Sequence, residues 1–307
     1  MKKNLIYLTI LSIVLLSCKK ENHTKTTNAQ GNLHQVVFNI NNFTQQNTPI
    51  NGSVKTKVND VVPPEQSDIV KLLYKLYDSS NTLKKTVTIN KGEPAFGTIQ
   101  DSLASGNYTA VFVGITYMDE YKDKFKDAGA TFSYSDIYGN DELFHETFYK
   151  KINFVVGDNP SVQDVVLERL TSEVQVIIQD AIPTKITDID VQIVNLNNAY
   201  SYFDDISSGT IDYDHATSIP SGKIGTTNFS PGPEGPLLNT NSPVTIYVSA
   251  RYYSTIIARR TISNIILQRN TRTILTGNLF SNSSGDASGF TVTYNSAYNP
   301  NDINQGF

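Results

Sequence analysis

The chain has 307 residues, with 25 Lys and Arg against 29 Asp and Glu, a net charge of −4 and a single cysteine. No basic run follows the N-terminal segment, so the sequence does not predict a basic surface that would bind nucleic acid. One cysteine cannot form an internal disulfide. Trp is absent, while 17 Tyr and 14 Phe accompany many Asn, Thr and Ser. This composition favours strands and turns, and the length favours two domains.

The N-terminus carries the pattern of an export signal. A basic start, Met1–Asn4, is followed by the apolar run Leu5–Leu16 and then by Ser17 and Cys18. The apolar run is shorter than the roughly 18 residues of a spanning helix, so we expect the mature chain not to span a bilayer. The run into Cys18 resembles a bacterial lipobox, which implies a signal peptide over 1–17 and lipid on Cys18. The alternative is a buried or accidental cysteine.

The segment after the predicted cleavage site indicates a tether. Residues 18–32 are polar and lack hydrophobic periodicity, which is typical of a flexible linker. Several acyl chains on one residue make membrane anchoring durable. Lys19, Lys20 and Glu21 resemble signals that send Bacteroidetes-type lipoproteins to the outer face of the outer membrane. We therefore expect a lipid-anchored, outer-membrane protein exposed at the cell surface; the alternative for these charges is solubility alone.

Alternating patterns predict the strands of the first half. Ile69–Tyr77 and Leu83–Ile89 flank a turn signal and predict a β-hairpin. A second hairpin is predicted where Phe96–Leu103 meets Tyr108–Ile115 through a Gly-containing turn. Further strands are predicted at Gln35–Ile40 and Ile152–Val156. The stretch 117–149 lacks alternation and is interpreted as an excursion, with a short helix beginning near Asp141.

Gly and Pro at 157–160 predict a domain boundary, which divides the chain into 33–160 and 161–307. We interpret Asn197–Leu238 as irregular, and the three prolines and two glycines of Ser230–Pro236 as a surface loop. The strands predicted in this half are Val162–Leu167, Ser172–Gln179, Ile189–Ile193, Val244–Ala250, Thr255–Arg260, Asn264–Gln268, Arg272–Leu279 and Phe290–Tyr294. Short strands separated by turns predict an all-β sandwich architecture.

The sequence offers little support for catalysis, a metal or a cofactor. The four histidines, His23, His34, His145 and His215, are scattered and lack metal-ligand spacing. Neither a nucleophile elbow nor a phosphate-binding loop occurs. Asp136, Asn140, Asp141 and Glu142 form a polar cluster that could bind calcium, but this is the less favoured interpretation, because the order of these residues departs from that of the EF-hand loop. We expect no enzyme; a glycosidase, whose two carboxylates come from distant positions, is the third alternative.

Aromatic residues suggest a possible ligand surface. They cluster at Phe132, Tyr134, Tyr138, Phe144, Phe148 and Tyr149, and again at Tyr200, Tyr202, Phe203 and Tyr213. Aromatic faces stack on sugars, but packing into the core is the favoured interpretation. Asp101-Ser102-Leu103 also fits a short O-glycosylation pattern, although three residues match by chance too often to carry weight.

Five stretches together resemble the FimB-like fimbrillin-A associated anchor proteins, through their order and spacing: Phe96–Leu103, Gly106–Gly114, Leu167–Leu170, Asp180–Pro183 and Asn270–Phe280. The resemblance implies two tandem transthyretin-like Greek-key β-sandwich domains and a lipid-anchored base or minor subunit of a surface fimbria. Its partners would be shaft or accessory subunits. Polymerising relatives are trimmed after an early arginine, whereas no arginine lies between Cys18 and Arg169 here, which favours an anchor.

Two alternatives stay open. The chain could be a surface lipoprotein that binds glycans or host proteins on the same scaffold. The region from Ser281 to Phe307 could contact a partner, or it could be a final strand followed by a frayed tail. An exposed sheet edge offers unpaired N–H and C=O groups to an incoming strand, but the sequence does not indicate which edge would serve.

Overall fold

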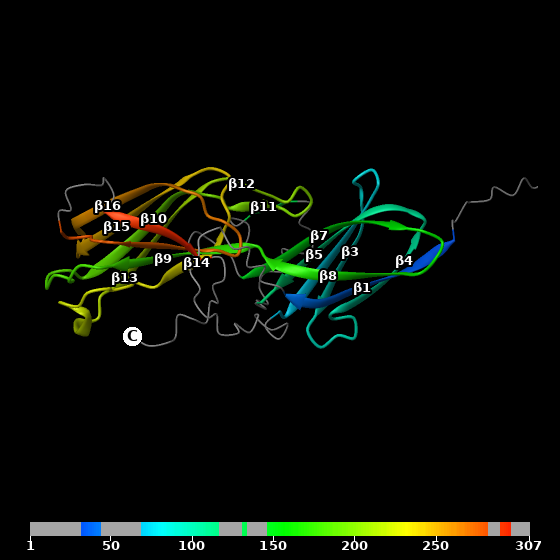
Figure 1. Cartoon of the computed structure of the whole chain (residues 1–307), viewed down its shortest axis with the longest axis horizontal. Coiled ribbons are helices and arrows are strands. Elements are labelled where there is room, and N and C mark those ends of the chain that lie inside the picture. The colour runs from blue at the N-terminus through cyan, green and yellow to red at the C-terminus, as the bar shows by residue number, and fades with distance from the viewer. Residues whose placement is uncertain (1–31, 44–68, 117–130, 134–145, 282–288, 296–307) are drawn as a thin grey trace, which may run out of the picture. The chain divides into compact units, whose positions relative to one another are not determined.

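The computed structural model describes residues 32–43, 69–116, 131–133, 146–281 and 289–295. Apart from a short 3-10 turn, η3 (Ser221–Lys223), its regular elements are strands, so the predicted all-β class is confirmed (Figure 1). The strands are β1 (Leu33–Phe43), β2 (Lys71–Asp78), β3 (Leu83–Asn90), β4 (Thr98–Ala104), β5 (Gly106–Ile115), β6 (Thr131–Ser133), β7 (Thr147–Val156), β8 (Ser161–Arg169), β9 (Thr171–Ile178), β10 (Asp188–Leu196), β11 (Ala199–Ser201), β12 (Ile206–Ser208), β13 (Ile211–Ser218), β14 (Pro233–Leu238), β15 (Val244–Tyr252), β16 (Thr255–Ile265), β17 (Arg272–Gly277) and β18 (Phe290–Asn295).

The first half forms one folded-over sheet with the order β3-β2-β5-β7-β8-β1-β4. Only two residue pairs join β7 to β8, so the sheet bends there and its two parts face each other across a core. Phe38 on β1 is fully buried and lies 5.2–5.4 Å, ring to ring, from Tyr74, Phe112 and Phe154. Each such buried ring contributes roughly 1.5–3 kcal/mol relative to exposure.

The second half is built from two four-stranded sheets, β13-β10-β15-β16 and β14-β9-β17-β18. Their inward faces share one hydrophobic core with alternating residues from each strand, such as Ile189, Val191 and Ile193 of β10. The period of two predicted these faces correctly, because successive side chains on a strand point to opposite sides.

The two halves repeat one connectivity. In the first half β1 pairs antiparallel with β4 and parallel with β8, β2 pairs with β3 and β5, and β7 pairs antiparallel with β5. In the second half β9 pairs antiparallel with β14 and parallel with β17, β10 pairs with β13 and β15, and β16 pairs antiparallel with β15. In order, β1, β2, β3, β4, β5, β7 and β8 correspond to β9, β10, β13, β14, β15, β16 and β17. A small sheet of β12, β11 and β6 is inserted, and β18 is the one further strand of the second half.

A third hydrophobic cluster joins side chains of both halves. It includes Val111 and Tyr149 from β5 and β7, together with Tyr200 from β11 and Leu238 from β14. The Tyr149 hydroxyl donates a hydrogen bond of 2.8 Å to the Tyr202 carbonyl. Strands β2 and β5 therefore bury side chains on both faces, which explains their nearly continuous apolar runs.

The predicted hairpin between Phe96–Leu103 and Tyr108–Ile115 is wrong. β4 pairs with β1, whereas β5 pairs with β2 and β7. The chain passes between the two layers at Ser105, because both strands direct apolar residues into the same core from opposite sides. The first predicted hairpin, β2 with β3, is confirmed.

The interpretation of Asn197–Leu238 as irregular is also wrong, since it contains β11, β12, β13 and β14. β14 pairs with β9 despite its prolines, with a register shift between Glu234 and Leu237. Proline is tolerated at the start of a strand, on an edge and at a bulge, and β14 offers all three. Leu237 and Leu238 are fully buried, which accounts for the strand.

Two further predictions change at their boundaries. Of the predicted helix from Asp141, the residues that the structure describes begin at Glu146, and Thr147–Tyr149 belong to β7. Phe148 and Tyr149 are both buried but in different clusters, which removes the alternation that reveals a strand. Of the strand predicted at Asn264–Gln268, Asn264 and Ile265 are the end of β16, whereas residues 266–268 belong to no strand. β8, which begins just after the predicted boundary at residue 160, pairs with β1 over Ser161–Leu167, and the division of the chain at residue 160 stays a prediction.

Candidate assembly surface

The predicted lipidation site, Cys18, lies outside the described residues, as do His23, His145 and the candidate calcium ligands. Within the part of the chain that the structure describes, no helix has the length and apolar character needed to cross a bilayer. In the same part, His, Cys, Asp and Glu do not gather in threes as a metal site would require.

Most of the described aromatic candidates are core residues. Phe148, Tyr149, Tyr200 and Tyr202 are at most 5% exposed, and the three tyrosines pack ring against ring. For these four residues the core interpretation is confirmed, because their faces are not open to a sugar. Tyr134, Tyr138 and Phe144 lie outside the described residues.

A buried carboxylate joins the two edge strands of the first half, β3 and β4. Asp101 of β4 accepts hydrogen bonds from the Lys85 ammonium of β3 at 2.8 Å and from the Tyr74 hydroxyl of β2 at 3.0 Å. Burial, and secondarily the charge of Asp101, raise the pKa of Tyr74, which keeps its hydroxyl a donor. We call this group the Asp101 clip. Neighbouring Ser102 is exposed, and its glycosylation stays a prediction.

A second buried carboxylate joins the corresponding strands of the second half. Glu234 of β14 is 1% exposed and accepts a hydrogen bond of 2.7 Å from the Tyr213 hydroxyl of β13. His215 of β13 places Nδ1 3.0 Å from the same carboxylate. Burial raises the pKa of Glu234, and the contacts with Tyr213 and His215 oppose that rise. We call this group the Glu234 clip.

The two clips occupy matching places in the repeated connectivity. Asp101 lies opposite Val36 of β1, and Glu234 lies opposite Val174 of β9, both of them inward-facing core positions. The roles of both carboxylates were not predicted from the sequence. Asp101 could have been noticed as an acidic residue at an inward position between Ile99 and Leu103, whereas the prolines around Glu234 hide its strand.

The two halves differ in the strand pairing on the side away from the clips, beside β17 in the second half and β8 in the first. In the second half β18 pairs with β17 along Arg272–Gly277. In the first half β7 and β8 pair only at two residue pairs, near which the Lys150 ammonium lies 2.6 Å from the Glu168 carboxylate. Beyond those two pairs, the facing edges of β7 and β8 have no strand paired to them among the described residues.

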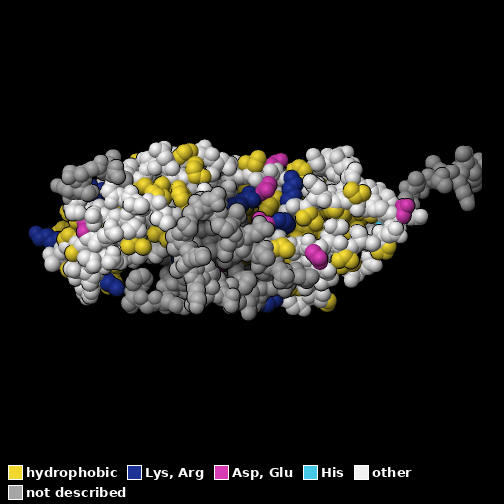
Figure 2. Space-filling view, in the orientation of Figure 1, with side chains coloured by type: hydrophobic (Ala, Val, Ile, Leu, Met, Phe, Trp, Pro, Cys, Tyr) yellow, Lys and Arg dark blue, Asp and Glu magenta, His cyan; other side chains and the backbone are white. Residues whose placement is uncertain are grey.

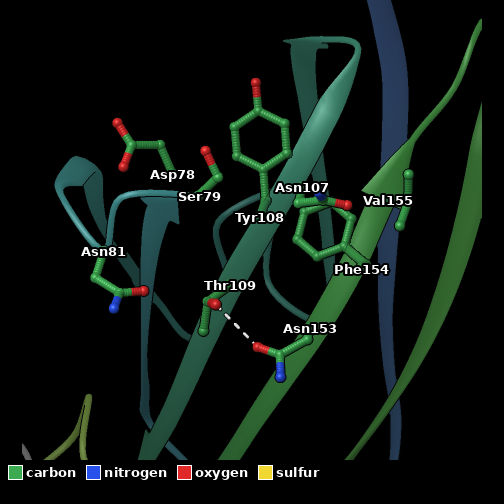
Figure 3. Close-up of a pocket in the computed structure, with 9 residues that line it drawn as sticks. All are labelled: Asp78, Ser79, Asn81, Asn107, Tyr108, Thr109, Asn153, Phe154 and Val155. Carbon is green, nitrogen blue, oxygen red and sulfur yellow. Dashed lines mark hydrogen bonds between the residues drawn. The ribbon is translucent and has the colours of Figure 1, made fainter.

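An open depression of about 380 Å³ lies beside the β2–β3 turn (Figure 3). Figure 3 shows the Tyr108 ring standing between Asp78 and Ser79 on one side and Phe154 on the other, with Asn81 and Asn153 below. Backbone N–H donation, mainly from Thr82, holds the pKa of the Asp78 carboxyl below its usual value. Among the described residues of the lining, Asp78 is the single acidic one, and these residues do not supply the carboxylate pair that a glycosidase uses.

Hydrophobic side chains on the face shown in Figure 2 lie in scattered groups rather than in one large patch. Such single exposed residues are ordinary on protein surfaces. On that face a strand edge is thus a better candidate for assembly than an apolar patch.

The fold is similar to that of several solved structures. The fimbrial anchor protein Mfa2 from Porphyromonas gingivalis is 12% identical, with 86% of this chain and 98% of that chain covered at a TM-score of 0.53. A candidate cell adhesion protein from Bacteroides eggerthii is 10% identical, covering 86% and 95% at 0.52. A structure from Bacteroides thetaiotaomicron described as candidate polysaccharide binding proteins is 10% identical, covering 86% and 96% at 0.52. At such identities these likenesses show the fold alone.

A family model that matches most of the chain shows the family to which it belongs. The model of the fimbrillin-A associated anchor proteins Mfa1 and Mfa2 matches residues 45–298, which include every described strand from β2 to β18. A search of curated proteins finds no match. The family consists of fimbrial anchors rather than enzymes, and the resemblance seen in the sequence is confirmed. The chain belongs to the fimbrillin-A associated anchor protein family.

Proposed function

We propose that this chain is a lipid-anchored fimbrial anchor or minor fimbrial subunit, which holds or templates other subunits through strand edges. The observation that carries the proposal is the family match over residues 45–298, which spans both halves of the fold. In this proposal the halves are two tandem transthyretin-like domains. Lipid on Cys18 attaches them to the outer membrane, and the polar segment 18–32 lets them stand away from it.

Strand edges support this mode of action. In the described chain the buried carboxylates of Asp101 and Glu234 are held by hydrogen bonds from neighbouring strands, and no three potential metal ligands meet in that part of it. Backbone groups at a sheet edge give an incoming strand directional hydrogen bonds without any reactive side chain. A scaffold built this way binds by pairing rather than by catalysis.

The anchor is tested with Cys18→Ser in the native host. We expect the variant to leave the envelope fraction, because a thioether to lipid cannot form on serine. A matched control replaces Lys19, Lys20 and Glu21 with alanine: the lipid stays, so the protein remains in the envelope, but protease shaving of intact cells should no longer remove it. Retention of Cys18→Ser in the envelope after a high-salt wash would refute lipid anchoring.

The fimbrial role is tested separately. Affinity purification of the full-length protein should recover a fimbrial subunit, and deletion of its gene should release fimbriae into the medium. If neither happens, the chain is not a fimbrial component.

A second candidate function is glycan binding at the depression of Figure 3. The observation in its favour is an aromatic ring, Tyr108, surrounded by the amides Asn81, Asn107 and Asn153, a combination that suits sugar recognition. A glycan array would test it, with Asn81→Ala and Asn107→Ala expected to abolish any signal and Asn90→Ala, at a half-buried position of β3 outside the depression, as the control. An array without binding, or binding unchanged in both variants, rules this candidate out.

A further inference from the structure

The repeated connectivity exposes a difference between the two halves. Seven strands of the first half have counterparts in the two large sheets of the second, and β18 is the strand of those two sheets that has no counterpart among the described residues of the first half. β18 runs antiparallel along β17, from Gly277 opposite Phe290 to Arg272 opposite Asn295. The place beside β8 that corresponds to β18 is therefore without a described strand.

The pairing of β8 defines this place. On one side Ser161–Leu167 pair in parallel with β1. On the other side β8 meets β7 only at Glu168 and Arg169, and Figure 1 shows the two strands joined by a broad turn at their far ends. Seven residues of β8 thus present one edge without a described strand, which is enough for a partner of the length of β18.

Two other edge strands of this half, β3 and β4, are less suited to accept a strand. β3 and β4 are tied to each other through the Asp101 clip, which directs a buried carboxylate, a lysine and a tyrosine into the seam between them. The second half closes the matching seam with the Glu234 clip. In both halves that seam is locked, and in the second half the opposite side is the one that receives an additional strand.

β18 also indicates what the occupant looks like. Its Phe290 is buried in the second core and packs close over Gly277, while Val292 two residues on is partly buried. Thr291 and Thr293 alternate with them and are less buried. An occupant of the β8 edge would need the same period of two, with apolar residues directed toward the core residues Val165 and Leu167.

We propose that the edge of β8 over Ser161–Leu167 is the acceptor for one antiparallel β-strand of a partner fimbrial subunit, with alternating apolar and polar residues. This inference rests on the proposed fimbrial function and names the edge that carries it. Pairing over about six residues satisfies the free backbone groups of β8 and covers Val162, which is 62% exposed.

The test places a photo-crosslinking residue, p-benzoyl-phenylalanine, at Val162 of the full-length protein in cells that produce fimbriae. The matched control carries it at Leu83, which is 43% exposed on β3 at the locked seam. Both side chains are exposed, so both variants should fold. We expect a covalent adduct with a fimbrial subunit from position 162 at a yield at least about tenfold above that from position 83, because cross-strand neighbours lie within about 5.5 Å.

Amide hydrogen exchange on the purified complex gives an independent readout. Residues 161–167 should exchange at least about tenfold more slowly in the complex than in the free protein, with no change over β3, because new backbone hydrogen bonds protect their amides. An adduct from position 83 as strong as that from 162, or co-purification without any adduct at 162 and without protection of β8, overturns the choice of edge. Absence of co-purification overturns the proposed function itself, and this inference with it.

Discussion

A buried ion pair lies where the chain enters the second half, and its removal tests the structure quantitatively. Glu173 on β9 and Arg272 on β17 are opposite each other in parallel register and are 5% and 6% exposed. Arg272 Nη2 donates to Glu173 Oε2 at 3.3 Å, and Nε lies 3.1 Å from Oε1. Arg272→Met leaves the carboxylate buried without this partner, which costs about 3–5 kcal/mol of unfolding free energy.

The double variant separates charge from packing. Replacing Glu173 with Leu together with Arg272→Met removes both charges, so we expect it to be more stable than Arg272→Met alone, by about 2 kcal/mol or more. Arg259→Met, at an exposed arginine of β16, serves as the control and should cost less than about 1 kcal/mol.

The stability of Arg272→Met relative to the parent should also depend on pH. Burial raises the pKa of Glu173, and the charge of Arg272 opposes that rise. A carboxyl whose folded pKa exceeds its unfolded value binds protons more tightly in the folded state, so its contribution to stability falls as pH rises above the unfolded pKa. Arg272→Met should raise the pKa of Glu173 further, and the variant should therefore regain stability, relative to the parent, when the pH is lowered from 7 to 5.

Urea unfolding followed by far-UV circular dichroism measures these differences, since the chain has no Trp to report by fluorescence. Hydrogen exchange over β9 and β17 assigns the change to this half. A loss below 1 kcal/mol in Arg272→Met that does not vary between pH 5 and 7 would refute the reasoning.

Two further predictions concern strand contacts. Gly277→Ala would place a Cβ 2.2 Å from the Gly289 carbonyl oxygen, so we expect a loss of about 1–3 kcal/mol and faster amide exchange over β18, whereas Gly157→Ala, with nothing within 4 Å, should be neutral; equal stability of the two variants would contradict the β17–β18 pairing. Lys85→Met removes a hydrogen bond to the buried carboxylate of the Asp101 clip and should cost about 1.5–3 kcal/mol in urea unfolding, against less than about 1 kcal/mol for Lys84→Met at an exposed ion pair; similar losses would show that the clip does not close the seam.

Local sequence patterns indicate the strands and their faces wherever one face is buried and the other is exposed to solvent. Ile189–Ile193 shows the clear case, because a period of two is a local property that needs no knowledge of neighbours. The sequence also indicated the family and predicted lipid on Cys18, since both inferences depend on short sequence motifs and their order along the chain.

Which strands are neighbours depends on the tertiary structure. β4 directs alternate residues inward, yet it pairs with β1, about 60 to 70 residues away, and not with β5, which follows it. Local periodicity states which face is buried but not against what, and the pairing is set by the arrangement that brings all inward faces into one core. For the same reason the sequence did not reveal β14, whose buried leucines hold it in place despite its prolines. It also did not reveal the two clips or the edge of β8 that no described strand covers, because these form only when distant strands lie side by side.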